Sequence, residues 1–336
     1  TMSARRKSGV GVAPTVDAPM PLITVDQHGK FVVGHEALNL LRQIKGDIAV
    51  VAVAGLYRTG KSYILNRLLG KQAGFAVGPT VNPCTKGIYM WGKPIQLGRQ
   101  DQEPLNLLLV DTEGIGSIQQ DQTYDVKIFS LAILLSSYFV YNSMSIIDER
   151  ALDGLSLVVN LTQQITAKSA ASGTKANGGG RKANKTLEGA ADPSELAEYF
   201  PHFLWLLRDF ALDLVDDRGA PITSRQYLES ALRERPEAAQ QSKNGIRQAI
   251  KQLFRERDCV TLVRPVVDEK QLKTIDAIPY NNLRAEFREQ SDELVQKIFD
   301  EAPVKQINGQ NLTGDSFAKL IQIYTEAINT GAVASI

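Results

Sequence analysis

The stretch that decides the fold runs from Ile48 to Ser62 and reads IAVVAVAGLYRTGKS. Its first half is a continuous run of apolar, largely β-branched residues, which is typical of a strand buried on both faces of a parallel sheet. Its second half begins at Gly55 and matches the phosphate-loop pattern GxxxxGK[ST] at every fixed position. The next residues, YILNRLLG, have the spacing of an amphipathic helix. Strand, glycine-rich loop and helix in this order predict a site for the phosphates of a nucleotide.

The chemistry expected of this loop follows from its backbone. Successive N–H groups form a nest for anions, and the N-terminus of the following helix adds partial positive charge. We expect Lys61 to reach the β- and γ-phosphates and the hydroxyl of Ser62 to ligate Mg²⁺. The residues predicted to contact the nucleotide from this loop are Gly55, Leu56, Tyr57, Arg58, Thr59, Gly60, Lys61, Ser62 and Tyr63.

A second buried run, NLLLVD, ends at Asp111 and is followed by Thr-Glu-Gly. A carboxylate at the carboxyl end of a strand lies beside the nucleotide crevice of such a sheet. Asp111 therefore suits the role of a Mg²⁺ ligand acting through water. Gly114 has no side chain, so the backbone there can approach the γ-phosphate closely.

The base-reading motif NKxD, common in GTPases, does not occur in a fitting place, and Arg208-Asp209 follows the buried run FLWLL instead. An aspartate there can accept two hydrogen bonds from N1–H and the 2-amino group of guanine, a donor pair that adenine lacks. Such charge-assisted bonds contribute roughly 1.5–3 kcal/mol each. We expect Arg208 to pack its guanidinium on the base. The alternative is an ordinary solvated Arg-Asp pair after a strand.

The remaining pattern alternates strands and helices. Short strands LITVD and KFVV surround a turn at His28-Gly29, a helix is expected over 36–44, and CVTLVRP is a fourth core strand. The 14 residues from Ile128 to Tyr141 read as one buried helix, since a membrane span needs roughly 20 apolar residues. The segment 213–244 is polar, and helices follow it. This order predicts an α/β protein: a P-loop NTPase three-layer sandwich with a mostly parallel central sheet.

Four segments are expected along the chain. Residues 1–20 lack periodicity and form a disordered tail, and 21–310 form a large GTPase domain. Within that domain, 168–191 is rich in glycine, alanine, asparagine and lysine and reads as a flexible loop. Residues 311–336 begin a helix, which we interpret as the start of a following helical region.

Composition excludes some classes of function. The 336 residues carry 38 Lys or Arg against 37 Asp or Glu, so no overall charge favours nucleic acid or an anionic membrane. Two cysteines are too few for a disulfide framework and fit a reducing compartment. The N-terminus lacks the apolar core of a signal peptide. We expect a cytoplasmic protein, with the nucleus as a further location.

Several motifs taken together carry a family resemblance. GLYRTGKSYILNRLLG, the segment PCTKG at 83–87, DTEGIG, SLAILLSSYFVYNS and WLLRDF resemble the guanylate-binding proteins, large GTPases of the dynamin superfamily. The resemblance covers about Pro21 to the C-terminus, and the form PCTKG is similar to the plant guanylate-binding-protein-like branch. It implies GTP as the substrate and Mg²⁺ as the cofactor.

The resemblance also implies roles for single residues. Thr85 is the switch I threonine that ligates Mg²⁺, and Glu113 belongs to switch II. Arg58 is an internal arginine finger, which completes the site when two G domains meet face to face. The implied catalytic set is therefore Arg58, Lys61, Thr85 and Glu113. Arg247 follows a segment that is similar to the guanine cap, and with Lys251 it stands where the family has basic cap residues.

One position departs from the family. The animal proteins have a serine where this chain has Pro83, and proline offers neither hydroxyl nor N–H. Two functions stay open: GTP hydrolysis coupled to homodimerisation and assembly, with a role in cell-autonomous defence, or a GTP-gated dimerising module with little turnover. A membrane-tethering GTPase of the atlastin type would need a transmembrane region. Contact with a membrane or a pathogen surface is expected only through regions outside this chain.

Overall fold

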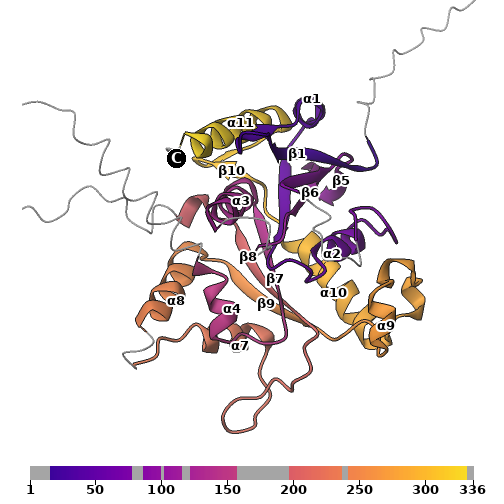
Figure 1. Ribbon diagram of the computed structural model, residues 1–336, viewed down its shortest axis with the longest axis vertical. Helices are drawn as coiled ribbons and strands as arrows, with labels where there is room; N and C mark the ends of the chain where they lie inside the picture. Colours follow the sequence, from indigo (N-terminus) through magenta and orange to yellow (C-terminus); the bar gives the residue numbers. More distant parts are fainter. Residues whose placement is uncertain are drawn as a thin grey trace, which may run out of the picture.

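The structure is a computed structural model that describes residues 16–77, 86–99, 102–115, 122–156, 197–236 and 241–330. The predicted loop 168–191 lies outside the described residues, as do Pro83 and Thr85 of the predicted switch I. Figure 1 follows the described chain from its N-terminal strands to its last helix.

The strands of the described residues are β1 (Pro19–Val25), β2 (Phe31–Val33), β3 (Ile48–Ala54), β4 (Ile88–Trp91), β5 (Ile95–Arg99), β6 (Gln102–Thr112), β7 (Tyr138–Met144), β8 (His202–Arg208), β9 (Arg257–Leu262), β10 (Gln306–Ile307) and β11 (Gln310–Asn311). Within that part of the chain, nine of them form one sheet in the order β2-β1-β4-β6-β3-β7-β8-β9, with β5 beside β6. The strands β6-β3-β7-β8-β9 run parallel, so their carboxyl ends meet at one edge. The mostly parallel sheet is confirmed, and an antiparallel margin of β2, β1, β4 and β5 extends it.

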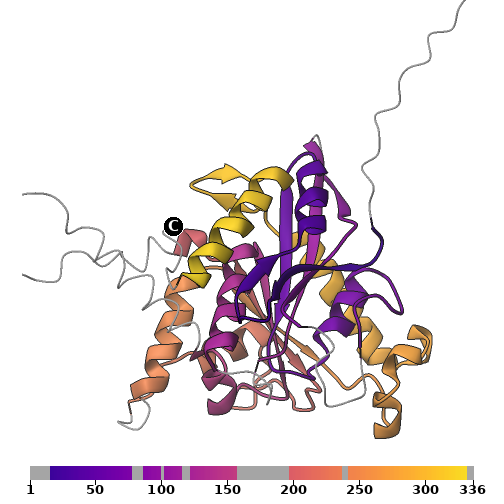
Figure 2. The same cartoon turned by 45° about the horizontal axis from the view of Figure 1, so that its top comes forward.

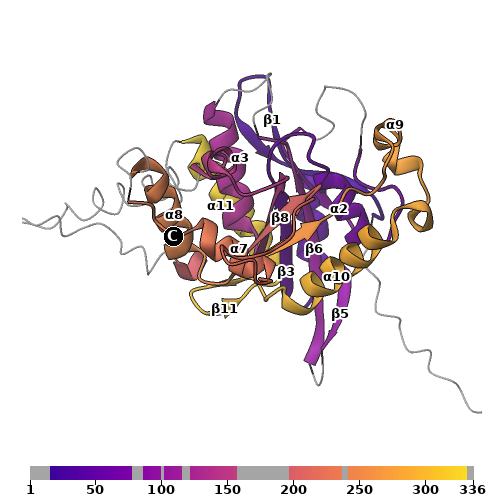
Figure 3. The ribbon, with the colours of Figure 1, turned by 90° about the horizontal axis from the view of Figure 1, so that it is seen from below.

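The helices are α1 (His35–Gln43), α2 (Lys61–Leu68), α3 (Gln122–Leu135), α4 (Glu149–Asp153), α7 (Ser224–Ala231), α8 (Gln241–Leu253), α9 (Glu269–Leu272), α10 (Ala285–Glu301) and α11 (Gly314–Asn329). They cover both faces of the sheet, and β3 is buried along its whole length between them. Alternate residues of β3 serve the two faces, since Val50 and Ala52 join the core under α1, α3 and α11, whereas Val51 and Val53 join the core under α2 and α10. Figure 3 shows these two helix layers on either side of the strands. The three-layer sandwich is confirmed.

The interpretation of Ile128 to Tyr141 as one helix is wrong. Helix α3 ends at Leu135, and β7 begins at Tyr138 in parallel register with β3. Ser136 and Ser137 make the break, because the hydroxyl of Ser137 accepts the N–H of Val50 at 3.0 Å and so starts the new strand against β3. An apolar run buried on all sides carries no period that separates helix from strand.

Two other boundaries differ from expectation. Strand β1 begins at Pro19, inside the segment expected to be disordered, because Pro19 and Met20 pair with the last two residues of β4. The segment expected to be only polar contains α7, which begins with a capping box between Thr223 and Gln226. That spacing, a threonine three residues before a glutamine, is a helix-start signal in the sequence.

Helix α11 packs back onto the domain. Phe317, Ala318 and Ile321 belong to the same buried cluster as Leu41 of α1. Figure 2 shows α11, in yellow, alongside α1, in indigo. A helix over this segment is confirmed, and it contributes to the core of the sandwich. Its role as the first helix of a further region stays a prediction.

Candidate functional site

The loop between β3 and α2 has the backbone that a phosphate nest needs. Gly55 has φ +143°, and a Cβ there would lie 2.0 Å from the carbonyl oxygen of Asn142 on β7. Gly60 has φ +82° and precedes the first residue of α2. Only glycine takes such conformations without strain. The side-chain amide of Asn142 donates to the carbonyl of Thr59 at 2.9 Å and so fastens the loop to β7.

Within this loop, Arg58 combines an unusual backbone conformation with an exposed side chain. Its φ is +62°, one of four positive values among non-glycine residues in the described chain. A left-handed conformation is uncommon for a long side chain and collects at functional sites. The residue is exposed, as is Leu56 beside it. The loop therefore holds the backbone of Arg58 tightly while its side chain reaches the surface.

Lys61 points back into the loop. The residue is 7% exposed, and its Nζ donates to the carbonyl of Leu56 at 3.0 Å. Burial lowers the pKa of Lys61, an effect that the carboxylates of Asp111 and Glu113 oppose. A buried ammonium at the mouth of a nest of N–H groups attracts an anion strongly, because the surrounding dielectric is low.

Ser62 and Asp111 face one another across the loop. The Oγ of Ser62 donates to Oδ2 of Asp111 at 2.7 Å, and Asp111 is 1% exposed. Hydroxyl and carboxylate oxygens are hard donors, and Mg²⁺ is typically held by one or two protein ligands together with water and phosphate oxygens. Among the described residues no group of three or more His, Cys, Asp and Glu could hold a metal. The pair of Ser62 and Asp111 offers two such oxygen ligands, which suits Mg²⁺ held jointly with a phosphate.

Glu113 connects the two segments predicted to be switches. Its Oε2 accepts the backbone N–H of Gly87 at 3.0 Å and the hydroxyl of Tyr124 on α3 at 2.5 Å. Burial, followed by the bond to Glu113, raises the pKa of Tyr124. The other oxygen, Oε1, is buried without a hydrogen-bond partner in the described part of the chain. Such an atom needs water or a ligand to satisfy it.

Gly114 permits a close contact between the phosphate loop and the segment after β6. A Cβ on Gly114 would lie 2.2 Å from the Cα of Tyr57. The N–H of Ile115 donates to the carbonyl of Gly55, and the N–H of Tyr57 donates to the carbonyl of Ile115, both at 3.1 Å. The side chain of Tyr63, by contrast, turns away from the loop into the core, beside Phe287.

Arg208 lies beneath the phosphate loop in this structure, and its expected packing on a base stays a prediction. Its guanidinium is buried under the phosphate loop, where Nη1 lies 3.5 Å from the carbonyl of Thr59 and 3.4 Å from that of Gly60. Burial lowers the pKa of Arg208, and the carboxylate of Asp209 opposes this. Arg208 thus ties the end of β8 to the phosphate loop and supports the loop from below.

Asp209 is the next residue and has φ +54°. Its Oδ2 accepts from Nε of Arg264, which follows β9, at 3.4 Å. The side chain is 18% exposed and lies at the same sheet edge as the phosphate loop. This is the position that the sequence predicts for a base-reading carboxylate.

Arg247 is not brought to the phosphate loop. It is fully buried, and its guanidinium contacts Oε1 of Glu149 at 2.6 Å, the carbonyl of Ala231 and the side chain of Asn244. These contacts join α8 to α4 and to the end of α7, so Arg247 has a packing role in this structure. Its role as a nucleotide contact stays a prediction. Lys251 lies 3.6 Å from Glu234 in an exposed ion pair.

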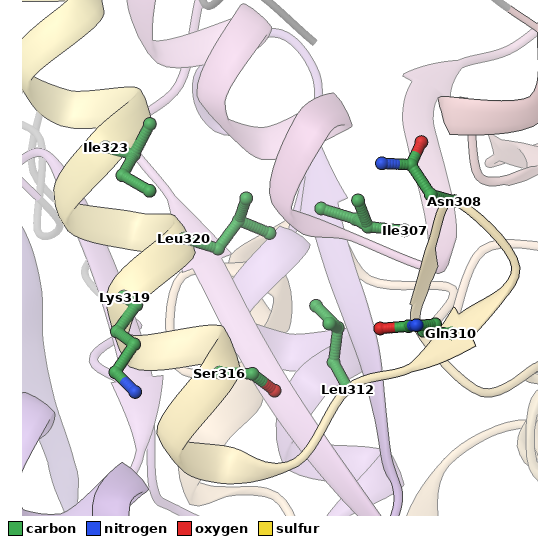
Figure 4. A pocket seen from close by; sticks show the side chains of 8 residues that line it. All are labelled: Ile307, Asn308, Gln310, Leu312, Ser316, Lys319, Leu320 and Ile323. Carbon is green, nitrogen blue, oxygen red and sulfur yellow. The ribbon is translucent and has the colours of Figure 1, made fainter.

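A hollow of about 300 Å³ lies elsewhere on the domain, between α11 and the β10–β11 hairpin. In Figure 4 Leu312, Leu320 and Ile307 point into it. The hairpin is bonded to the first residue of β3, since Ile48 donates to Leu312 and accepts from Lys305. The hollow is therefore at the sheet edge opposite the phosphate loop and takes no part in that site.

The loop, the Ser62–Asp111 pair and the parallel sheet define a P-loop nucleotide-binding domain. The family model for the guanylate-binding protein N-terminal domain matches residues 28–307. Human guanylate-binding protein 4 is 41% identical over 320 residues, which are 94% of this chain and 47% of that protein. Mouse guanylate-binding protein 3 is 39% identical over 322 residues, 95% of this chain and 49% of that protein.

This chain belongs to the guanylate-binding protein family. It spans about half the length of the curated relatives it matches. In the described ranges, no helix combines the length and the apolar character needed to cross a membrane.

Proposed function

We propose that this chain binds GTP together with Mg²⁺ and hydrolyses the γ-phosphate. The observation that carries the proposal is the pair of Ser62 and Asp111, 2.7 Å apart beside the buried ammonium of Lys61. These are the metal ligands and the phosphate-binding cation of a P-loop NTPase in one place. The names of the relatives and the position of Asp209 support guanine as the base.

Each group then has a task set by its place. The N–H groups from Gly55 to Ser62 receive the phosphates, and Lys61 offsets their negative charge. Ser62 and Asp111 would hold Mg²⁺, which supplies positive charge to the β- and γ-phosphates when bound. Glu113 holds Gly87 and Tyr124, so it connects the end of the predicted switch I to α3. Thr85 is proposed as a further Mg²⁺ ligand from its sequence position alone.

We further propose that two G domains associate through the nucleotide edge and that association activates hydrolysis. The support is the distribution of exposed large apolar side chains in the described chain. Six of ten lie at the carboxyl ends of the parallel strands or in the loops that follow them, and they are Leu56, Met144, Ile146, Leu212, Val215 and Val267. Apolar groups gathered at one edge are a mark of an interaction surface. Arg58 is exposed on the same edge, where a closing partner domain would meet it.

Phosphate release measured against protein concentration tests this proposal. Hydrolysis coupled to dimerisation gives a specific activity that rises with concentration, and Arg58→Ala loses the rise while keeping nucleotide affinity. Arginine fingers contribute about 10³–10⁵ in rate. Lys61→Ala is the control without nucleotide binding.

Light scattering with GDP–aluminium fluoride reports association directly. A wild type that stays monomeric with this analogue would remove the dimer mechanism. A wild type that dimerises with GTP but releases almost no phosphate would favour the GTP-gated module, which the hydroxyl-free Pro83 makes a specific alternative.

We also propose a cytoplasmic location, with the nucleus as a second one, and a role in cell-autonomous defence. The location is supported by the two cysteines of the sequence, which fit a reducing compartment, and the role is what the family resemblance implies. Localisation of a tagged full-length protein before and during infection tests both, and confinement to a secretory compartment would contradict the location.

A further inference from the structure

The carboxylate proposed to read the base is not held by its own strand alone. Asp209 follows β8 with φ +54°, and the N–H of the next residue, Phe210, donates to the carbonyl of Leu262 on β9 at 2.9 Å. Strands β8 and β9 are parallel neighbours, with Arg208 opposite Leu262. Arg264 lies two residues beyond Leu262, so Asp209 and Arg264 extend from adjacent strand ends at the same edge.

The contact between these two side chains is single rather than forked. Nε of Arg264 lies 3.4 Å from Oδ2 of Asp209, and Nη1 turns instead to Oε1 of Glu269 at 3.4 Å. A carboxylate has about four lone-pair sites on two oxygens. One N–H donor therefore orients the group and leaves acceptor capacity for a ligand, whereas a forked guanidinium would occupy both oxygens.

The backbone around Arg264 is itself held in place by residues that lie outside the proposed nucleotide site. The carbonyl of Arg264 accepts from Nη1 of Arg284 at 3.3 Å, and the N–H of Arg284 donates to the carbonyl of Pro265 at 2.9 Å. The N–H of Val263 donates to the side chain of Gln290 on α10 at 2.8 Å. The hydrogen bond to Asp209 raises the pKa of Arg264, so the side chain stays cationic. Hydrogen bonds from the segment before α10 and from α10 itself thus fix the backbone from which the side chain of Arg264 extends.

We infer that Arg264 is a positioning residue for guanine selection: it holds the carboxylate of Asp209 in the orientation that accepts the two donors of the base. This rests on the proposed function, in which Asp209 reads guanine. Two aligned hydrogen bonds need one carboxylate orientation, and a carboxylate that is not held must be ordered on binding, which weakens the complex. A base with both donors loses more from a misaligned carboxylate than a base with one. Hypoxanthine, the base of inosine, has one of the two donors, because it keeps N1–H and lacks the 2-amino group.

Calorimetric titration with guanosine and inosine β,γ-imidotriphosphates tests the inference. Arg264→Ala is expected to weaken the guanosine analogue about five- to tenfold and the inosine analogue about twofold. Arg264→Lys, which keeps the charge with one shorter donor group, should recover part of the loss. In an Asp209→Ala background, Arg264→Ala should have no further effect, because a positioning residue acts only through the group it positions.

Arg99→Ala is the matched control. Arg99 makes an Arg–Asp pair of similar length, 3.5 Å to Asp47, and similar partial exposure. Because Asp47 precedes β3, this pair lies at the opposite edge of the sheet. The control should leave both titrations within twofold of wild type and its melting temperature close to that of Arg264→Ala.

Three results would overturn the inference. The first is that Arg264→Ala loses the same affinity for the guanosine and the inosine analogue. The second is that Arg264→Ala loses as much affinity in the Asp209→Ala background as in wild type. The third is that Arg264→Ala binds the guanosine analogue more tightly, which would mean that Arg264 competes with the base for Asp209. Equal affinity of the wild type for guanosine and adenosine analogues would instead overturn the proposed function. Titrations with the guanosine, inosine and adenosine analogues therefore distinguish a failure of the inference about Arg264 from a failure of the proposed function.

Discussion

Two buried lysines lie at opposite edges of the same sheet and are held in different ways. At the carboxyl edge Lys61 makes one hydrogen bond, to the carbonyl of Leu56, with two carboxylates nearby. At the other edge Lys305 is 4% exposed and donates to the carbonyls of Leu134 and Ser136 at 2.9 and 2.8 Å, where α3 ends. Lys305 caps a helix end, whereas Lys61 keeps donor capacity in a nest of N–H groups. The difference separates a structural cation from one placed to meet a ligand.

Non-glycine residues with positive φ are also distributed differently between the two edges of the sheet. Arg58, Ser145 and Asp209 have positive φ and follow β3, β7 and β8 at the carboxyl edge. The fourth such residue, Asn308, lies in the turn of the β10–β11 hairpin before Gly309, where asparagine and glycine are the usual residues. Positive φ values of non-glycine residues outside a β-hairpin turn are therefore found at the proposed nucleotide edge, as expected of a site that must be held in one geometry.

The largest effect is expected from Lys61→Ala. Removing the principal cation from a phosphate site should weaken a GTP analogue by about 10³-fold, or roughly 4 kcal/mol. The melting temperature of the nucleotide-free protein should change little, because within the described residues Lys61 makes one hydrogen bond, to the carbonyl of Leu56. Calorimetry and thermal unfolding measure both. Near-normal affinity for the analogue would show that the loop is not a phosphate site.

The opposite outcome is expected at Lys305. Lys305→Met keeps the apolar stem but removes the donor shared by two carbonyls at the end of α3. The free energy of unfolding should fall by about 2 kcal/mol, and nucleotide affinity should stay within twofold of wild type. Urea unfolding with a parallel titration checks this. A large loss of affinity in a folded Lys305→Met protein would break the distinction between the two lysines.

The pH dependence of stability, compared between wild type and Lys305→Met, gives a further test of the role of Lys305. Burial lowers the pKa of Lys305 to about 7, below its ordinary value of about 10.4 in an unfolded chain. Between these values the unfolded chain binds more protons than the folded protein. The stability of wild type relative to Lys305→Met should therefore rise with pH from about 7 to 10. A fall over this window would mean that the carbonyls of α3 favour the ammonium more than burial disfavours it.

A smaller and more selective effect is expected at the base. Asp209→Asn replaces an acceptor-only carboxylate by an amide that also donates, which matches the 2-oxo group of xanthine. Affinity for a guanosine analogue should fall by roughly 2 kcal/mol, and a xanthosine analogue should gain. Competition titrations with both analogues measure the switch. If Asp209→Asn lost the same affinity for both analogues, Asp209 would have a role in stabilising the fold rather than in recognising the base.

The smallest effect is expected at the start of α11. Thr313 caps this helix by accepting the N–H of Ser316, so Thr313→Ala should lower the free energy of unfolding by about 1 kcal/mol. The site lies at the edge opposite the phosphate loop, and GTP turnover should not change. Chemical denaturation measures the free energy of unfolding and phosphate release measures GTP turnover, each for the variant and for wild type. A turnover defect here would mean that the two edges are coupled.

Local sequence alone determined the central part of this protein. The run from Ile48 to Ser62 specifies a buried strand, a nest and a helix start, because the hydrogen-bonding groups of such a loop are contiguous in the chain. The same holds for Asp111 and Asp209, which end apolar runs and must reach the carboxyl edge once the strands are parallel. The strands β3, β6, β8 and β9 were predicted for this reason.

Only the tertiary structure decided what the arginines do. Arg208 supports the phosphate loop across about 150 residues of chain, Arg247 is buried against Glu149, and Arg264 reaches Asp209 from the next strand. A guanidinium has five donors on a long stem, so its neighbours in sequence say little about which carbonyl or carboxylate it meets. The boundary between α3 and β7 was hidden likewise, since an evenly apolar run has no period and pairing with β3 selects the strand.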